Sequence, residues 1–267
     1  MNKTFEQLIA EVLKQAHEGW DFSYIADRRH SENPSWAYGD TVLTKLAQVE
    51  TMLDTGTGGG EFLLSLRQRA SVWPKTVIAT EGYPPNVLVA KRTLAPVGIE
   101  VIDHDSEKPL PFAEETSDLV INRHDFFKPL EVLRVLKPGG KFITQQVGSE
   151  MNRGLNELLD APVKDYKEWV LERAVEQLAG VGFAILDKKE HRGTCRFDDV
   201  GAIVWYLNAI PWQIPDFSVE RYEERLRQVH EEIGMNGPIE VKNHFFYIEA
   251  QKSTTDSGES RIVNGER

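Results

Sequence analysis

A glycine-crowded turn follows a short apolar stretch in the first quarter of the chain. Residues 52–62 read Met-Leu-Asp-Thr-Gly-Thr-Gly-Gly-Gly-Glu-Phe, which predicts a buried strand that breaks into a tight turn and then opens a helix. Glycine reaches left-handed backbone conformations and, without a Cβ, lets a ligand approach the main chain. The segment therefore predicts a loop that binds a nucleoside-containing cofactor, with a ligand-free glycine turn as the alternative.

The spacing of the glycines disfavours two common nucleotide sites. A dinucleotide loop has a third glycine three residues beyond its second, and here the residue three beyond Gly58 is Glu61. A triphosphate loop continues from its last glycine into lysine and then Ser or Thr, whereas Gly60 is followed by Glu61. What remains is an acid followed by three alternating glycines, at Asp54, Gly56, Gly58 and Gly60.

The rest of the central region alternates between strand and helix patterns. Helices are expected over 61–70, 85–94, 126–136 and 165–179, and strands over 76–81, 99–102, 117–122, 141–144, 183–188 and 243–250. This alternation predicts a doubly wound α/β fold with a parallel sheet, right-handed crossovers and helices on both faces. Ligands in such sheets bind at the carboxyl ends of the strands.

Polar side chains stand at the predicted strand ends. Glu81 ends the second strand, where a carboxylate can accept hydrogen bonds from both hydroxyls of an adenosine ribose; a solvated acid at a turn is the alternative. Asp105 ends the third strand and can accept from the exocyclic amine of adenine, with Asp103 as the rival. The candidate cofactor site also includes Thr57 of the glycine loop, Gly82, Ser106 and Asn122 at the end of the fourth strand.

Three further segments complete a recognisable order of motifs: Leu110-Pro111-Phe112, then Ser117-Asp118-Leu119-Val120, then residues 134–140, Arg-Val-Leu-Lys-Pro-Gly-Gly. Over about residues 50–148 the chain resembles class I S-adenosylmethionine (SAM)-dependent methyltransferases of the ubiquinone and menaquinone biosynthesis type, the methyltransferase type 11 group. The resemblance implies SAM as the cofactor and a seven-stranded Rossmann-like sheet whose last strand runs antiparallel. Pro109 and Ser117 depart from the family pattern and imply a local change in the adenine wall.

The acceptor side is less defined by sequence. Methyl transfer depends mainly on aligning the nucleophile with the methyl group, and an acceptor that is protonated at neutral pH also benefits from a base. His124 is the candidate base; a packing histidine beside Asp125 as a surface helix cap is the alternative. Arg123 could hold a carboxylate or phosphate of the substrate, or bridge to a surface acid. Gln145 and Gln146 are expected to contact the substrate.

We expect a single domain over residues 1–252, followed by a disordered polar tail at 253–267. The expected parts are an N-terminal helical and aromatic cap at 1–50, a SAM-binding core at 51–192, a helical insertion at 193–240 and a last strand at 241–252. Within the cap and the insertion, helices are expected near 4–18, 198–209 and 218–233.

Composition narrows the class of substrate and the cell compartment. The net charge of −11 disfavours nucleic acid, because phosphate backbones are bound through lysine and arginine. No apolar run approaches the ~20 residues of a membrane helix and no signal pattern opens the chain, so a cytoplasmic protein is expected. The single Cys195 excludes an intrachain disulfide, and no spacing of His, Asp and Glu resembles a metal site.

Together these features predict a SAM-dependent methyltransferase that acts on an oxygen or nitrogen of a small molecule. Two alternatives stay open: a SAM-binding regulatory protein without catalysis, and an RNA methyltransferase, which would carry a basic stripe leading into its cleft. The sequence does not predict the oligomeric state or the identity of the acceptor.

Overall fold

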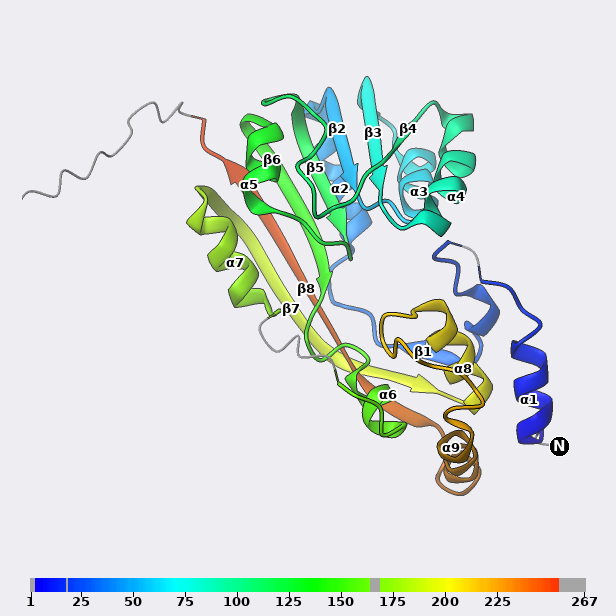
Figure 1. Ribbon diagram of the computed structural model, residues 1–267. Helices are drawn as coiled ribbons and strands as arrows, with labels where there is room; N and C mark the ends of the chain where they lie inside the picture. Colours follow the sequence, from blue (N-terminus) through cyan, green and yellow to red (C-terminus); the bar gives the residue numbers. More distant parts are fainter. Residues whose placement is uncertain (1–2, 18, 164–168, 255–267) are drawn as a thin grey trace, which may run out of the picture.

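The computed structural model describes residues 3–17, 19–163 and 169–254. Their strands form one eight-stranded sheet in the order β1-β7-β8-β6-β5-β2-β3-β4 (Figure 1). The strands are β1 (Arg29–Ser31), β2 (Thr51–Thr55), β3 (Thr76–Glu81), β4 (Glu100–Asp103), β5 (Ser117–Arg123), β6 (Leu136–Val147), β7 (Phe183–Phe197) and β8 (Ile239–Lys252). The five strands from β2 to β6 are parallel, and β8 runs antiparallel to β6 and β7. The antiparallel last strand confirms the arrangement that the family resemblance implies.

The expected count of seven strands was short by one. The additional strand, β1, pairs antiparallel with the far end of β7, with Arg29 opposite Phe197 and Ser31 opposite Cys195. β7 extends nine residues beyond the expected end at 188, and an uncovered strand edge of that length would leave its backbone groups unpaired. Residues 29–31 cover this edge although their sequence, Arg-His-Ser, has no strand pattern.

Helices cover both faces of the parallel part of the sheet. On one face, α2 (Tyr38–Lys45), α3 (Glu61–Arg69) and α4 (Pro84–Leu94) pack against side chains such as Met52 and Ile121. On the other face, α5 (Pro129–Val135) and α7 (Leu171–Gly180) pack against their sequence neighbours, Leu53 and Val120. Because successive side chains of a strand point to opposite faces, continuous apolar runs in β2 and β5 supply both cores.

The hairpin of β7 and β8 extends beyond the parallel strands and carries a second, largely helical layer (Figure 1). This helical layer comprises α1 (Phe5–Val12), η1 (Ser23–Ile25), α6 (Arg153–Leu158), α8 (Val200–Ala209) and α9 (Glu223–Asn236). Nearly every residue of α8 is buried, and it packs with α1, α6 and α9 in a separate apolar core that includes Cys195. The insertion before the last strand is thus helical, as the sequence predicts. Two further short helices, η2 (Leu46–Gln48) and η3 (Ala95–Val97), precede β2 and β4.

Several element boundaries differ from the expected ones. α1 ends at Val12, α5 begins at Pro129 instead of at 126, and β6 begins at Leu136, five residues before the expected strand. Proline at the first helical position fixes where α5 can start. The predictions for residues 164–168 and 255–267 lie outside the described residues. Within the described part, no helix has both the length and the apolar character needed to cross a membrane.

Candidate active site

The glycine loop connects β2 to α3 at the carboxyl edge of the sheet. Gly56, Gly58 and Gly60 have φ values of 70°, 66° and 86°, which lie in the left-handed region that favours glycine. The backbone N–H of Thr57 donates to the carbonyl of Thr80 at 2.9 Å and ties the loop to β3. The alternating glycines of the sequence are therefore required by backbone geometry.

The same glycines also allow close approach from other segments. A Cβ on Gly58 would collide with the indole of Trp20, and a Cβ on Gly56 would collide with the carboxylate of Asp125. The loop thus lies beneath a tryptophan of the N-terminal segment and beside the residues that follow β5. This is a backbone cradle that a side chain would fill.

Glu81 ends β3 and points its carboxylate at the glycine loop. One oxygen accepts from the backbone N–H of Gly58 at 2.6 Å, and the other accepts from the N–H of Tyr83 at 2.8 Å. The side chain is only 6% exposed, and burial raises the pKa of this carboxyl to about 7. Each oxygen keeps lone-pair capacity for a further donor.

Two more acids share this region. Burial raises the pKa of Asp54, at the end of β2, to about 7 and that of Asp125, after β5, to about 6. Asp125 was interpreted from sequence as a surface cap, but α5 is preceded by Lys128 at its N-cap and Asp125 lies inside the site. Its place directly after a strand end was the signal that could have found it. Carboxyls with pKa values of about 6 to 7 are partly or mostly ionised near neutral pH, which favours a ligand that carries positive charge.

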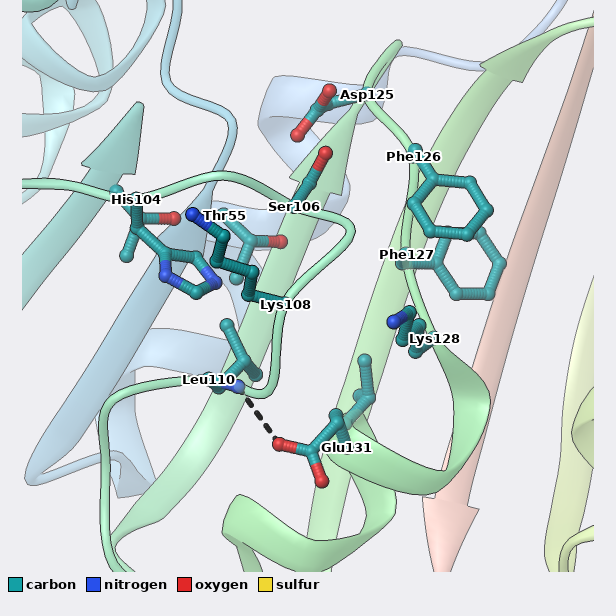
Figure 2. Close-up of a pocket in the computed structure, with 12 residues that line it drawn as sticks. Thr55, His104, Ser106, Lys108, Leu110, Asp125, Phe126, Phe127, Lys128 and Glu131 are labelled. Carbon is teal, nitrogen blue, oxygen red and sulfur yellow. Dashed lines mark hydrogen bonds between the residues drawn. The ribbon is translucent and has the colours of Figure 1, made fainter. Parts of the chain in front are cut away.

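A narrow cleft opens beside these acids, at the ends of β2, β3 and β5 (Figure 2). His104 stands on one side and Phe126 and Phe127 on the other. The cleft has a free volume of about 20 Å³, so a planar ring enters only when a wall side chain turns aside. Nε2 of His104 is buried and has no hydrogen-bond partner among the described residues. Sequence analysis passed over this histidine, although it stands between the two acids considered for adenine.

Ser106 lines the cleft, whereas Asp105 does not. The Asp105 carboxylate accepts from the backbone N–H of Glu107 at 3.0 Å and lies 3.7 Å from the Lys108 ammonium, on the exposed side of the loop. Gly82 packs closely against the main chain at His104, which fixes how near the ends of β3 and β4 lie.

Two of the sequence motifs are joined by one arginine. The guanidinium of Arg134 donates to the carbonyls of Phe112 at 2.7 Å and Leu110 at 2.9 Å, and it pairs with Glu131 at 2.7 Å. Glu131 in turn accepts from the N–H of Leu110 at 2.8 Å (Figure 2). The Leu-Pro-Phe segment and the Arg-Val-Leu-Lys-Pro-Gly-Gly segment therefore hold the wall of the cleft in place.

Asn122 and Gln146 form an interstrand network. The Asn122 amide donates to the carbonyl of Thr55 at 3.1 Å and accepts from Thr144 at 3.2 Å and from Gln146 at 2.5 Å. Both amides are almost fully buried, at 0% and 3% exposure. The structure places these two predicted ligand contacts between strands, where their hydrogen-bonding groups are used within the protein.

Gln145 lies on the opposite face of β6 from Gln146, because neighbouring strand residues alternate. It is paired in register with Arg123 of β5, and both line a second hollow, on the other side of the β5 end from the cleft. The adjacent glutamines therefore do not act as a pair, and only Gln145 opens onto free space.

His124 follows Arg123 in a left-handed backbone conformation, with φ of 63°, which is uncommon for a residue other than glycine. Its Nε2 lies 3.0 Å from Nε2 of Gln145, and its ring stacks on Phe245. Burial, followed by the charge of Arg123, lowers the pKa of the imidazole to about 3. The imidazole is therefore neutral at physiological pH.

Among the described residues, no group of three His, Cys, Asp or Glu could hold a metal ion.

Comparison with known proteins agrees with this geometry. Residues 53–144 match the family described as "Methyltransferase domain". Similar structures include a candidate methyltransferase from Bacillus halodurans C-125 (TM-score 0.55, 20% identity, covering 80% of this chain and 100% of that chain) and the YcgJ protein from Bacillus subtilis (TM-score 0.57, 18% identity, covering 81% and 98%). Among curated protein sequences, none matches this chain.

Residues 53–144 thus carry the match to the methyltransferase domain family, and the described residues share the fold of these two neighbours. The same fold is found in the 4+2 cyclase SpnF (TM-score 0.51, 16% identity, covering 94% of this chain and 93% of that chain). Because one fold can host different reactions, what a methyltransferase domain of this kind acts on has to be argued from its own side chains.

Proposed function

We propose that this protein binds SAM at the glycine loop and transfers its methyl group to an oxygen or nitrogen of a small molecule. The observation that carries the proposal is the Glu81 carboxylate, buried at the end of β3 and held by the N–H groups of Gly58 and Tyr83. It lies where two ribose hydroxyls can donate to it. When bound, SAM supplies an electrophilic methyl group on a positively charged sulfur.

The residues of the site fit this cofactor. The turn formed by Gly56, Thr57, Gly58 and Gly60 leaves main-chain atoms accessible, and the carboxyls of Asp54 and Asp125 offset a positive charge near it. For the adenine ring, Ser106 and the unpaired nitrogen of His104 line the cleft. Asp105 stays a prediction for this role, as do Gly82 and Asn122 for the cofactor site.

His124 is proposed to act on the acceptor. In the described geometry its Nε2 is occupied by Gln145, so service as a general base at Nε2 requires the Gln145 amide to turn away. The remaining ring nitrogen carries the hydrogen and can donate to an acceptor oxygen. Either role holds the nucleophile in line for displacement, which is the main requirement of this reaction.

The proposed setting is a single domain of residues 1–252 in the cytoplasm, acting on a small molecule. The buried free thiol of Cys195 suits a reducing compartment, and the net charge of −11 disfavours RNA as the acceptor. A regulatory protein without catalysis needs no open space for a methyl acceptor. The hollow lined by Arg123 and Gln145 is such a space, and it therefore favours an enzyme.

Incubation with SAM labelled in its methyl group tests the proposal. The purified protein is mixed with a cell extract that is divided into a small-molecule fraction, an RNA fraction and a protein fraction. Label in the small-molecule fraction, lost in the Gly58→Ala variant, is the expected result. Label in RNA would support the RNA methyltransferase instead. Tight SAM binding without transfer to any fraction would support the regulatory protein.

A further inference from the structure

A hollow lies between the N-terminal segment and the ends of β5 and β6. It is lined by residues 33–39 together with Phe62, Arg123 and Gln145, and its free volume is about 430 Å³. A volume of this size accommodates a small organic molecule. We call it the acceptor hollow. The proposal below rests on the proposed function, because it names the kind of acceptor that this hollow takes.

Arg123 is the charged residue of this lining. Its guanidinium carbon lies 4.7 Å from the centre of the Phe62 ring, and no carboxylate of the described residues forms an ion pair with it. The Arg123 side chain is exposed; desolvation lowers its pKa, and the charges of Tyr38 and Asp54 oppose that shift. A guanidinium that lines open space without an ion pair can bind an anion from outside the chain.

The other polar groups of the hollow, which include the side chains of Asn33 and Ser35, are uncharged. The side-chain oxygen of Gln145 accepts from the indole N–H of Trp36 at 2.8 Å, so it is already occupied. The Tyr38 hydroxyl donates to the main-chain carbonyls of Asn122 at 3.1 Å and Ile143 at 3.0 Å. The guanidinium of Arg123 is therefore the strongest hydrogen-bonding group left to a ligand.

The position of the hollow assigns it to the acceptor. The cleft lies at the ends of β2, β3 and β5 and is bordered by His104 after β4, whereas the hollow lies on the other side of the β5 end, toward β6 and the N-terminal segment. Phe62 of α3 stands two residues beyond Gly60, the last of the alternating glycines, and borders the hollow. A cofactor whose adenosine were held by Glu81 and the cleft would leave the hollow open to the acceptor.

We propose that the acceptor hollow binds a carboxylate or phosphate group of the methyl acceptor. The planar fork of Arg123 pairs with two oxygens of that group, and the rings of Trp36 and Phe62 form walls for the adjoining apolar part. The methyl acceptor is accordingly an anionic small molecule.

Binding of simple anions to the complex with S-adenosylhomocysteine tests this assignment. Benzoate and inorganic phosphate are titrated calorimetrically into the saturated wild-type protein, with benzamide as the uncharged match for benzoate. The variants are Arg123→Gln, Arg123→Lys and the control Arg67→Gln. In the wild type, Arg67 lies near the C-terminal end of α3, and its guanidinium lies over the ring of Trp73. We expect at least one of the two anions to bind the wild type and Arg67→Gln with similar affinity. The same anion should bind Arg123→Gln at least about tenfold more weakly, and its affinity for Arg123→Lys should lie between these values.

The source of the anionic group is distinguished by comparing S-adenosylhomocysteine with 5′-methylthioadenosine, which lacks the amino-acid carboxylate. Equal affinity of Arg123→Gln and wild type for both compounds supports the acceptor as the source. Loss of S-adenosylhomocysteine binding alone would assign Arg123 to the cofactor and overturn the proposal, as would unchanged anion binding in Arg123→Gln or no anion binding by the wild type. Failure of the wild type to bind S-adenosylhomocysteine would instead contradict the proposed function.

Discussion

The indole N–H of Trp36 donates to the side-chain oxygen of Gln145 at 2.8 Å. Since an indole nitrogen can only donate, this contact fixes which end of the Gln145 amide is oxygen. The amide nitrogen must then face Nε2 of His124, at 3.0 Å, and donate to it. The neutral imidazole of His124 consequently carries its hydrogen on Nδ1.

This chain of hydrogen bonds predicts the tautomer of His124. In the wild type, the nitrogen chemical shifts of the His124 ring should report hydrogen on Nδ1. Trp36→Phe removes the donor that orients Gln145, so we expect both tautomers in that variant, together with a loss of about 1 kcal/mol in the free energy of unfolding. Heteronuclear NMR of the imidazole rings measures both states. A wild-type ring with its hydrogen on Nε2 would contradict the orientation of Gln145.

Replacing His124 itself should separate turnover from cofactor binding. His124→Ala is expected to slow methyl transfer by about tenfold or more, because it removes a group that positions or deprotonates the acceptor, while the affinity for SAM changes little. Since the pKa of His124 is lowered to about 3, its own titration should not appear in the rate profile above pH 5. Steady-state rates and SAM titrations of the same variant provide the comparison. Wild-type rates in His124→Ala would remove this residue from the reaction.

Gly58 should tolerate no side chain, for a reason beyond backbone strain. Gly58→Ala places a Cβ against the indole of Trp20 and also costs about 1 kcal/mol for its positive φ. Gly98→Ala is the matched control, because Gly98 has a φ of 73° with open space around it. We expect both variants to lose some stability but only Gly58→Ala to lose SAM affinity. Equal SAM affinity in the two variants would mean that the loop does not contact the cofactor.

The raised pKa values of the site acids predict a pH dependence of SAM binding. Burial raises the pKa of Asp54 and of Glu81 to about 7, so both carboxyls are mostly protonated at pH 5.5 and mostly ionised at pH 8.5. A ribose hydroxyl and a sulfonium both favour the ionised forms. SAM affinity should therefore rise with pH across this interval, with release of protons on binding, and Glu81→Gln should flatten the rise. Calorimetry in buffers of different ionisation enthalpy measures both quantities. A flat profile in the wild type would contradict the assignment.

The features that sequence reveals here are local ones. The alternating glycines are demanded by three left-handed φ values within five residues, and Glu81 is identifiable because a strand pattern ends on an acid. The contacts between distant segments carry no such signal. Trp20 reaches Gly58 across 38 positions of chain, and nothing in the sequence around Trp20 indicates its partner.

Strand alternation separates two glutamines that the sequence predicts as a pair on the acceptor side. Gln145 and Gln146 look equivalent in sequence, but only the first opens onto the hollow, because the second shares its face of β6 with Thr144 and bonds to Asn122. The extra strand β1 was missed for a related reason. Its pairing is induced by the exposed edge of β7, a property of the long hairpin and not of residues 29–31.

Titration of SAM into wild type, Glu81→Ala and Glu100→Ala measures whether Glu81 holds the cofactor. Glu100 is an exposed acid at the opposite end of the neighbouring strand β4, so its removal controls for the lost charge. We expect wild type and Glu100→Ala to bind SAM alike and Glu81→Ala to bind it about 10- to 100-fold more weakly, because the ribose loses a charged acceptor. Equal SAM affinity in all three proteins would contradict the assignment of Glu81 and, with it, the placement of the cofactor.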